Sequence, residues 1–367
     1  MDDVVAVAER FAFPGKIVTV RDFGNGNINK TYLAILDSEV EGHFILQRIN
    51  SQVFQKPELI MRNMHVVTGH ISERLRCSEI DDGRRWEVPH IITTREGNDC
   101  WIDSDGSFWR AISYINNACT YDTVKDNNHA EEAGFALGMF HNLISDLSAD
   151  RLVDTLEGFH ILPRYLNHYN EVLGHKSIVK SPEVKYCLQF VDSRSCRSDI
   201  LENARSEGRL LLRPIHGDPK VNNIMIDNET GRAVGMIDLD TVKPGLVHYD
   251  IGDCLRSGCN PLGEETENWE AVRFEPDLCE AMLRGYIPAA REFLTSHDYD
   301  YLYDAVRLIA FELGLRFFTD FLEGNVYFNV KHPEQNLARA LVQFRLVESI
   351  ESRKETICSI VRELRYS

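Results

Sequence analysis

Apolar and polar residues alternate with a period of two through much of the first third of the chain. This pattern predicts strands at residues 16–20, 31–36 and 43–49, because successive side chains of a strand point to opposite faces. Residues 23–29, which contain two glycines, are expected to form the hairpin tip between the first two strands. A helix is expected at residues 57–76, and further strands at 86–92, 100–103 and 108–114.

After about residue 115 the apolar spacing changes to three and four residues, which is typical of helices. One short hairpin, at residues 223–237, interrupts this helix-rich part. A β-rich segment followed by a helix-rich one predicts an α+β fold of two lobes with a ligand cleft between them. We expect residues 1–115 to form the first lobe, 116–367 the second, and 116–119 the hinge. The helices are expected at about 129–146, 164–174, 182–205, 275–293, 298–322 and 335–364.

Composition narrows the range of partners and compartments. The 367 residues include 57 acidic and 40 basic ones, and the net charge of −17 disfavours nucleic acid and anionic membranes as partners. Nine cysteines without a Cys-x-x-Cys pair indicate reduced thiols. The N-terminus lacks the basic region and cleavage site of a signal peptide, and no apolar run approaches the roughly 20 residues that span a bilayer. We therefore expect a soluble cytoplasmic protein; the sequence carries no signal for its oligomeric state.

The strongest chemical signal is a His-x-Asp-x-x-x-x-Asn pattern just before the short hairpin. Its members are His216, Asp218 and Asn223, and Asp238 follows the second strand. If the strands pair antiparallel about the turn at residues 228–231, Asn223 and Asp238 meet at the open end, beside Asp218. Phosphoryl transfer from Mg-ATP requires carboxylate and amide groups that converge in this way.

Each polar group of this pattern has a predicted role. Asp218 is expected to accept the proton of the acceptor hydroxyl, and Asn223 and Asp238 to hold Mg²⁺ on the phosphates of ATP. Lys220 can offset the charge that develops on the transferring group. His216 is expected to brace the loop. The alternatives are a solvated acidic turn without chemistry, and a metal-dependent hydrolase, although such sites usually contain more than one His.

Candidate nucleotide contacts lie in the β-rich part. A hairpin with two glycines between the first two strands is where backbone amides cover phosphates in kinases, and a plain tight turn is the alternative. The third strand carries Gln47 and Arg48 where protein kinases have a phosphate-binding Lys, and only one of these neighbours can face the cleft. The candidate nucleotide-binding residues are Gly24, Asn25, Gly26, Gln47 and Tyr114.

Five short motifs along the chain carry a resemblance to a known family. They are Gly-x-Gly-x-Ile-Asn-x-Thr-Tyr at 24–32, Phe-Ile-Leu-Gln at 44–47, Met-Arg-Asn at 61–63, Asp-Leu-Asp-Thr at 238–241 and Phe-Leu-Glu-Gly-x-x-Tyr-Phe at 321–328. With the catalytic pattern, they make the chain resemble the aminoglycoside phosphotransferase and choline kinase group, and more closely the N-acetylhexosamine 1-kinases. The resemblance implies a protein-kinase-like fold with a small β-rich N-terminal lobe and a larger, mainly helical C-terminal lobe. It also implies ATP- and Mg²⁺-dependent phosphorylation of the anomeric hydroxyl of N-acetylglucosamine or N-acetylgalactosamine.

The resemblance further implies a sugar pocket. Arg316 and Tyr327 would line it, Asn27 would approach it from the glycine hairpin, and Asp218 would contact the reacting hydroxyl. Arg316 stands in an apolar helix, so its charge must be paired or point into a cleft, and Glu312 one turn earlier is the alternative partner. Kinases of choline, aminoglycosides or homoserine, and a binding module without catalysis, are the competing functions.

Three further expectations concern the surroundings of the catalytic pattern. Asp250 and Asp253 are expected to hold the loop that carries the catalytic pattern, residues 216–223, which we call the catalytic loop. His141 is expected to be a packing residue without a chemical role. Ser257 stands where the resemblance implies an aromatic ring stacked on the sugar. The acidic run at residues 263–267 is expected to be a solvated loop near the substrate.

Overall fold

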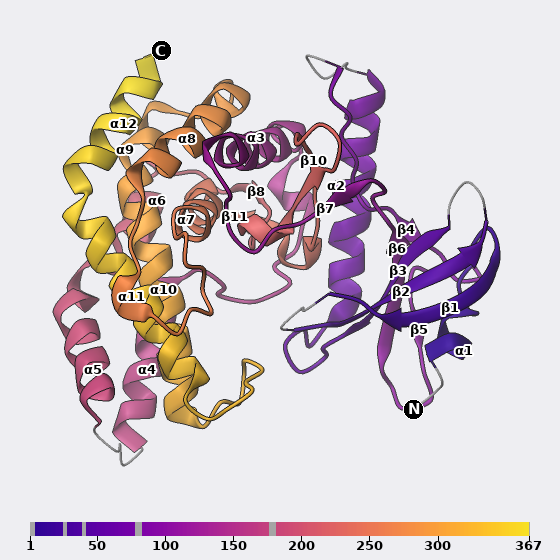
Figure 1. The fold of residues 1–367 in the computed structure, drawn as a ribbon, viewed down its shortest axis with the longest axis horizontal. Coiled ribbons are helices and arrows are strands. Elements are labelled where there is room, and N and C mark those ends of the chain that lie inside the picture. The colour runs from indigo at the N-terminus through magenta and orange to yellow at the C-terminus, as the bar shows by residue number, and fades with distance from the viewer. Residues whose placement is uncertain (1–3, 25–27, 39–41, 78–82, 176–180, 367) are drawn as a thin grey trace.

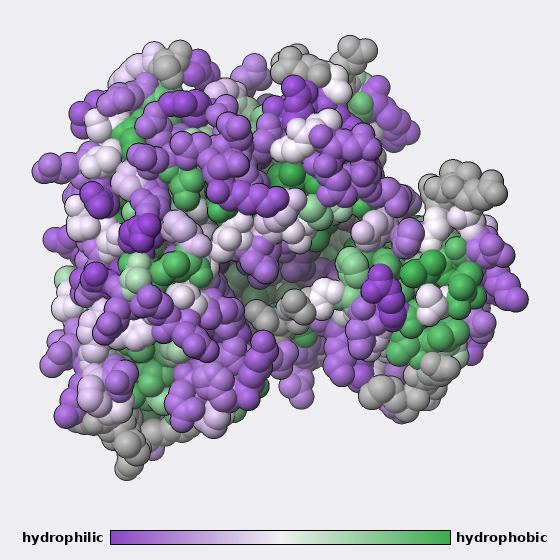
Figure 2. Space-filling model, viewed as in Figure 1, coloured by the Kyte–Doolittle hydropathy of each residue, from purple (hydrophilic) through white to green (hydrophobic). Residues whose placement is uncertain are grey.

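Two lobes make up the fold, one built on a β-sheet and the other mainly helical (Figure 1). The computed structural model describes residues 4–24, 28–38, 42–77, 83–175 and 181–366. This arrangement is the predicted two-lobed α+β fold. Figure 2 shows that the surface is hollowed between the lobes. In the described part of the chain, no helix combines the length and the apolar character that crossing a membrane demands.

A six-stranded antiparallel sheet forms the core of the N-terminal lobe. Its strands follow the order β1-β2-β3-β6-β4, and β5 pairs with β6. In β3, Phe44 and Leu46 are buried while their neighbours are more exposed, as the period-two pattern predicts. The elements of this lobe are α1 (Val4–Ala8), β1 (Lys16–Asp22), β2 (Lys30–Asp37), β3 (His43–Ile49), α2 (Pro57–Cys77), β4 (Ile91–Ile92), β5 (Trp101–Ile102) and β6 (Phe108–Ser113).

The C-terminal lobe packs helices around two small sheets that carry the catalytic pattern. One sheet has the order β10-β9-β7 and the other pairs β11 with β8. The small-sheet strands are β7 (Ala118–Cys119), β8 (Arg213–Ile215), β9 (Ile224–Asp227), β10 (Ala233–Met236) and β11 (Lys243–Gly245). The helices are α3 (Asn127–Leu143), α4 (Leu162–His175), α5 (Pro182–Arg194), α6 (Ile200–Ser206), α7 (Val247–Gly258), α8 (Pro276–Ala290), α9 (Ser296–Asp300), α10 (Leu302–Glu323), α11 (Gln335–Ser352) and α12 (Lys354–Tyr366).

Helices α3 and α8 cross at very short distance because glycines lie at their contact. A Cβ added to Gly134 would stand 1.8 Å from the carbonyl oxygen of Met282. A Cβ added to Gly285 would stand 1.9 Å from that of Glu131. Any side chain at either position would force the helices apart, and α3 also packs against α7 and β10, which border the catalytic loop.

Four sequence predictions of secondary structure, one strand and three helices, were wrong in extent. The expected strand 86–92 is only Ile91–Ile92, because its earlier part runs to the other lobe, where the Glu87 N–H donates to the Val234 carbonyl at 2.7 Å. The long helices expected at 182–205, 298–322 and 335–364 are each divided in two, near residues 195–199, 301 and 353.

Helix α7 was not predicted from the sequence. Eleven of its twelve residues are buried, so its polar side chains face protein instead of solvent. Its buried polar side chains are bonded to protein partners, among them His248 to the Asp298 carbonyl and Asp253 to Arg256. This helix borders the catalytic loop, so the omission matters for the site.

Candidate active site

The β9–β10 hairpin brings Asn223 and Asp238 together. Met236 pairs with Ile224, and the Ile237 N–H donates to the Asn223 carbonyl at 2.9 Å. Asp238 follows immediately in a left-handed backbone conformation, with φ of 65°, which is uncommon for a residue with a side chain. This turn leaves the Asp238 side chain exposed at the open end of the hairpin.

Asp250, on α7, holds the catalytic loop as expected. Its fully buried carboxylate accepts hydrogen bonds from the N–H groups of His216, at 2.7 Å, and Gly217, at 2.8 Å. The ring of His141 lies 2.8 Å from the same carboxylate, so this histidine is part of the loop's support. Gly217 has φ of 88°, and a Cβ there would stand 2.5 Å from the Thr241 carbonyl, so only glycine fits.

Asp218 lies in an electrostatic setting that keeps it ionised. Its carboxylate is 3.2 Å from Nζ of Lys220. Desolvation raises the pKa of Asp218, but the charge of Lys220 and its hydrogen bond lower it more, and the net shift is downward. The Asn223 side-chain NH₂ donates to the Asp218 carbonyl at 2.7 Å and to its carboxylate at 3.2 Å. An ionised, oriented carboxylate of this kind can accept a hydroxyl proton.

His216 braces this loop through both ring nitrogens. Desolvation in the core lowers the pKa of His216, which favours the neutral ring. In the matching tautomer, Nε2–H donates to the Ile237 carbonyl at 3.0 Å and Nδ1 accepts from the Asp218 N–H at 3.3 Å. The ring thus ties the Asp218 loop to the segment that leads into Asp238.

The oxygens at the open end of the hairpin fit a hard divalent cation. The Asp238 carboxylate has no hydrogen bond or ion pair to another described residue, and desolvation in the cleft, then Asp240 and Asp218, raise its pKa to about 7. Such a carboxylate gains by binding a cation. The Asn223 NH₂ donates to Asp218, which leaves the side-chain oxygen of Asn223 as a second ligand for the cation. No trio of His, Cys, Asp or Glu forms a metal cage in the described residues; Mg²⁺ commonly combines one or two protein ligands with phosphates.

Arg316 lies in a cage of aromatic rings instead of in an ion pair. Its guanidinium has no hydrogen bond or ion pair within the described part of the chain, and Glu312, the alternative partner, contacts His160 instead. Desolvation lowers the pKa of Arg316, but nearby groups including Asp218 raise it, and the net shift is upward. Four ring centroids surround the guanidinium carbon: those of Phe159 at 4.9 Å, Tyr165 at 5.2 Å, Phe328 at 5.4 Å and Tyr327 at 5.7 Å.

Asp320 fixes the loop that carries Tyr327, and sequence reasoning missed it. Its buried carboxylate accepts from the N–H groups of Val326 and Tyr327, each at 2.8 Å, and of Phe328 at 3.0 Å. The signal was present, because an acidic residue near the end of an apolar helix, four positions before Gly324, needs nearby donors.

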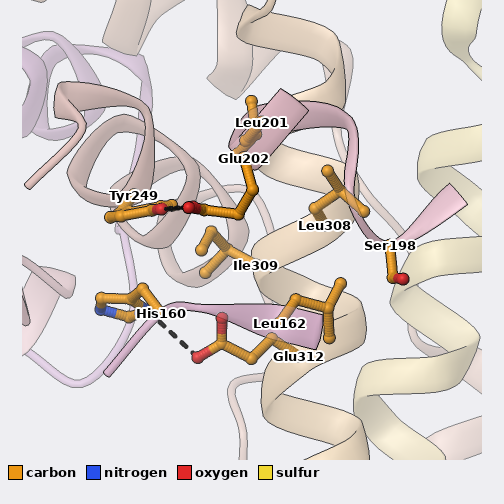
Figure 3. A pocket seen from close by; sticks show the side chains of 9 residues that line it. All are labelled: His160, Leu162, Ser198, Leu201, Glu202, Tyr249, Leu308, Ile309 and Glu312. Carbon is orange, nitrogen blue, oxygen red and sulfur yellow. Dashed lines mark hydrogen bonds and ion pairs between the residues drawn. The ribbon is translucent and has the colours of Figure 1, made fainter. Parts of the chain in front are cut away.

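His160 is a second support of the catalytic loop. One ring nitrogen lies 2.7 Å from the Gly217 carbonyl. The other lies 3.2 Å from the Glu312 carboxylate (Figure 3). Desolvation lowers the pKa of His160, but Glu312, the Gly217 carbonyl and Asp253 raise it more, so the net shift is upward. A protonated ring can donate to both partners. A cavity of about 10 Å³, lined also by Tyr249, adjoins this pair and has room for about one water.

We predict that His160→Gln weakens the fold in a pH-dependent way. Because folding raises the pKa of His160, its stabilising contribution is largest below the unfolded value of 6.5 and is lost as pH rises through the folded value. The variant should cost about 1–3 kcal/mol in free energy of unfolding at about pH 6, and less at about pH 9. Denaturant titrations at both pH values measure this, with the exposed His168→Gln on α4 as control. An equal loss at both pH values would contradict the charged pair.

Asp253 does not hold the catalytic loop, which corrects the sequence prediction. It pairs with Arg256 at 2.7 Å, and Arg256 also binds Glu264 at 2.9 Å. The acidic run is therefore partly tied down instead of being simply solvated. Ser257 uses its hydroxyl to accept the Val221 N–H at 3.2 Å, so it supports the loop after the candidate base.

The structure describes only some of the candidate nucleotide-binding residues. Gly24 has φ of 74°, as a turn glycine does, whereas Asn25, Gly26 and Asn27 lie outside the described residues. The Tyr114 ring packs against two others, with centroid distances of 6.0 Å to Phe23 and 5.6 Å to His43. The Gln47 side chain is bonded at both ends, to Arg110 and Thr31.

The chain matches one protein family and resembles several solved structures. The model of the phosphotransferase enzyme family (APH) matches residues 19–292. The microcompartment-associated aminopropanol kinase is 15% identical, with a TM-score of 0.63 over 97% of this chain and 98% of that one. Choline kinase from Cryptosporidium parvum Iowa II is 12% identical, with a TM-score of 0.60 over 99% and 98%. Amicoumacin kinase in complex with AMP-PNP and Ca²⁺ is 13% identical, with a TM-score of 0.57 over 96% and 94%. At these identities the likeness shows the fold alone.

Proposed function

This chain belongs to the phosphotransferase enzyme family, and on that premise we propose that it phosphorylates the anomeric hydroxyl of an N-acetylhexosamine, with Mg-ATP as donor. The family makes it a small-molecule phosphotransferase. The proposal adds the donor, the metal and the acceptor. The observation that carries the chemistry is the convergence of Asp218, Lys220, Asn223 and Asp238 at one end of the hairpin.

The proposed reaction is a single in-line transfer. Asp218 accepts the proton of the acceptor hydroxyl while that oxygen bonds to the γ-phosphorus, and the bond between the γ-phosphorus and the bridging oxygen of ADP breaks. Lys220, paired with Asp218, faces the charge that develops on the transferring group. Asn223 and Asp238 would hold Mg²⁺, which supplies charge neutralisation to the phosphates when bound.

The acceptor site is proposed around Arg316. An arginine with rings on several sides and no carboxylate partner has its donors available for a ligand, and a sugar offers hydroxyl and amide oxygens to them. The ring of Tyr327, 37% exposed, lies beside it and offers an apolar face to the pyranose. Choline and other cationic acceptors gain nothing from a cation at this place, so Arg316 favours the sugar over them.

A coupled assay of ADP release tests the proposed function directly. The acceptors are N-acetylglucosamine, N-acetylgalactosamine, glucose, galactose, choline, an aminoglycoside and homoserine, each with Mg-ATP. Turnover with an N-acetylhexosamine well above the others supports the proposal, and ³¹P NMR identifies the product as the 1-phosphate. Preference for choline, an aminoglycoside or homoserine would overturn the acceptor assignment and leave the phosphotransferase class intact.

Replacing Arg316 with Ala is predicted to raise KM for the sugar by about 10- to 150-fold, because a charged hydrogen bond is worth roughly 1.5–3 kcal/mol. KM for ATP should change little. Steady-state kinetics with each substrate varied measures both constants, and a melting curve monitors the fold. Arg284→Ala, which removes an exposed i,i+4 ion pair on α8, is the control. An unchanged sugar KM with a lower melting midpoint would show that Arg316 serves only to stabilise the helix.

A further inference from the structure

A buried ion pair joins the two lobes close to the proposed metal site. Arg110, on β6, places Nη2 2.5 Å from Oδ1 of Asp240, in the turn that follows Asp238. The two residues are 1% and 2% exposed. Burying two charges costs several kcal/mol of desolvation each, and an apolar pair would stabilise the fold as well. A role beyond stability is therefore needed to account for the pair.

Two more residues of the N-terminal lobe complete this contact. The Gln47 side-chain oxygen accepts from Nε and Nη2 of Arg110, at 2.9 and 2.7 Å. Asn29, at the end of the glycine hairpin, donates its NH₂ to the other Asp240 oxygen at 2.6 Å. Strands β3 and β6 place Gln47 directly opposite Arg110. We call Asn29, Gln47, Arg110 and Asp240 the interlobe latch.

The latch stands where protein kinases have a different ion pair. In those enzymes a third-strand Lys binds a Glu of the following helix, and the pair must form for activity. Here the third strand supplies Gln47 instead. From the helix, α2, the Met64 sulfur accepts from Nη1 of Arg110 at 3.8 Å. Asn63 of this helix bonds the backbone of the other lobe, at the Val242 carbonyl, 2.8 Å away.

We propose that the interlobe latch takes over the task of the Lys–Glu pair, by closing the β-rich lobe on the helical lobe and fixing the turn that carries Asp238. Arg110 acts as a positioning residue because its guanidinium is enclosed, with Nε and Nη2 on Gln47, Nη2 also on Asp240, and Nη1 against Met64. Asp240 lies two residues after Asp238, so a shift of one moves the other. The inference rests on the proposed role of Asp238 in holding Mg²⁺.

A double-mutant cycle tests the latch. Arg110→Met and Asp240→Leu should each lower kcat by about 10²-fold, because a misplacement of about 1 Å has that effect, and should weaken Mg-ATP binding in calorimetry. Arg110→Met combined with Asp240→Leu should show the loss of one single variant instead of the product of two. The double variant should melt close to the wild type, because an apolar pair replaces the ion pair.

The control is Arg85→Met, which removes another arginine–aspartate contact between the lobes, with Asp227 at the far end of the same hairpin. It should leave kcat and Mg-ATP affinity near wild type. Wild-type kcat in the apolar double variant would overturn the latch, and so would multiplicative losses. Weakened Mg-ATP binding in Arg110→Met but not in Asp240→Leu would show that Arg110 contacts the phosphates directly. Wild-type protein that binds no Mg-ATP would overturn the proposed function together with the latch, whereas failure of the cycle alone overturns only the latch.

Discussion

Asp218→Asn is expected to lower turnover by about 10³-fold, within the range that general-base catalysis contributes. The asparagine keeps the shape of the carboxylate but cannot take up a proton. Because Asp218 is proposed to face the acceptor hydroxyl and not the nucleotide, the affinity for Mg-ATP should change little. Single-turnover measurements of ADP formation give the chemical step, and calorimetry gives the nucleotide affinity.

Two comparisons make this result specific to the base. Asp227→Asn makes the same chemical change at the opposite end of the same hairpin, where the carboxylate accepts the N–H groups of Glu229 and Thr230. It should leave turnover near the wild-type value. An Asp218→Asn protein that retains more than about a tenth of wild-type turnover would show that another group accepts the proton.

The parts of the site that follow from local sequence were predictable. A short hairpin with a fixed turn places its two ends together, so Asn223 and Asp238 meet whatever surrounds them. The support of the catalytic loop by Asp250 was also predicted, although Asp250 lies 34 residues after His216. The hairpin itself needed only neighbouring residues.

The parts that depend on distant segments were not predictable. Arg110 is the cation beside Gln47 only because β3 pairs with β6 in one register, and the sequence considered strand by strand does not fix that register. His160 reaches the catalytic loop from a segment 57 residues earlier. Helix α7 was missed, and the partners of its buried polar side chains lie partly in distant segments, such as the Asp298 carbonyl for His248.

The charge distribution explains how an acidic protein can serve an anionic nucleotide. The net charge of −17 repels ATP at long range. In the described residues around the cleft, Lys220 and Arg316 lie near Asp218, and Asp238 has a pKa raised to about 7 by desolvation and the neighbouring Asp240 and Asp218. A divalent cation held by Asp238 would make the local charge there positive instead of negative. Nucleotide binding should therefore depend on the metal more steeply than on the protein's own cations.

Asp238→Asn tests this dependence and should have the second large effect. The change removes the charged ligand of the proposed Mg²⁺ site, and we expect kcat/KM to fall by about 10³-fold, since metal stabilisation of the transition state is worth several kcal/mol. Calorimetry should show Mg-ATP binding reduced to the level that the wild type shows with ATP and EDTA. Without metal, the variant should bind ATP at least as tightly as the wild type, because the amide removes a negative charge beside the phosphates.

The outcome separates a metal ligand from a residue that only shapes the turn. Asp238 has a left-handed backbone with φ of 65°, and asparagine tolerates that conformation well, so the turn should persist in the variant. A melting midpoint close to or above that of the wild type, measured without metal, is expected because a carboxylate crowded by Asp240 and Asp218 has been neutralised. If the variant bound Mg-ATP as tightly as the wild type, Asp238 would not be the ligand, and the cation would have to be held by other oxygens of the cleft.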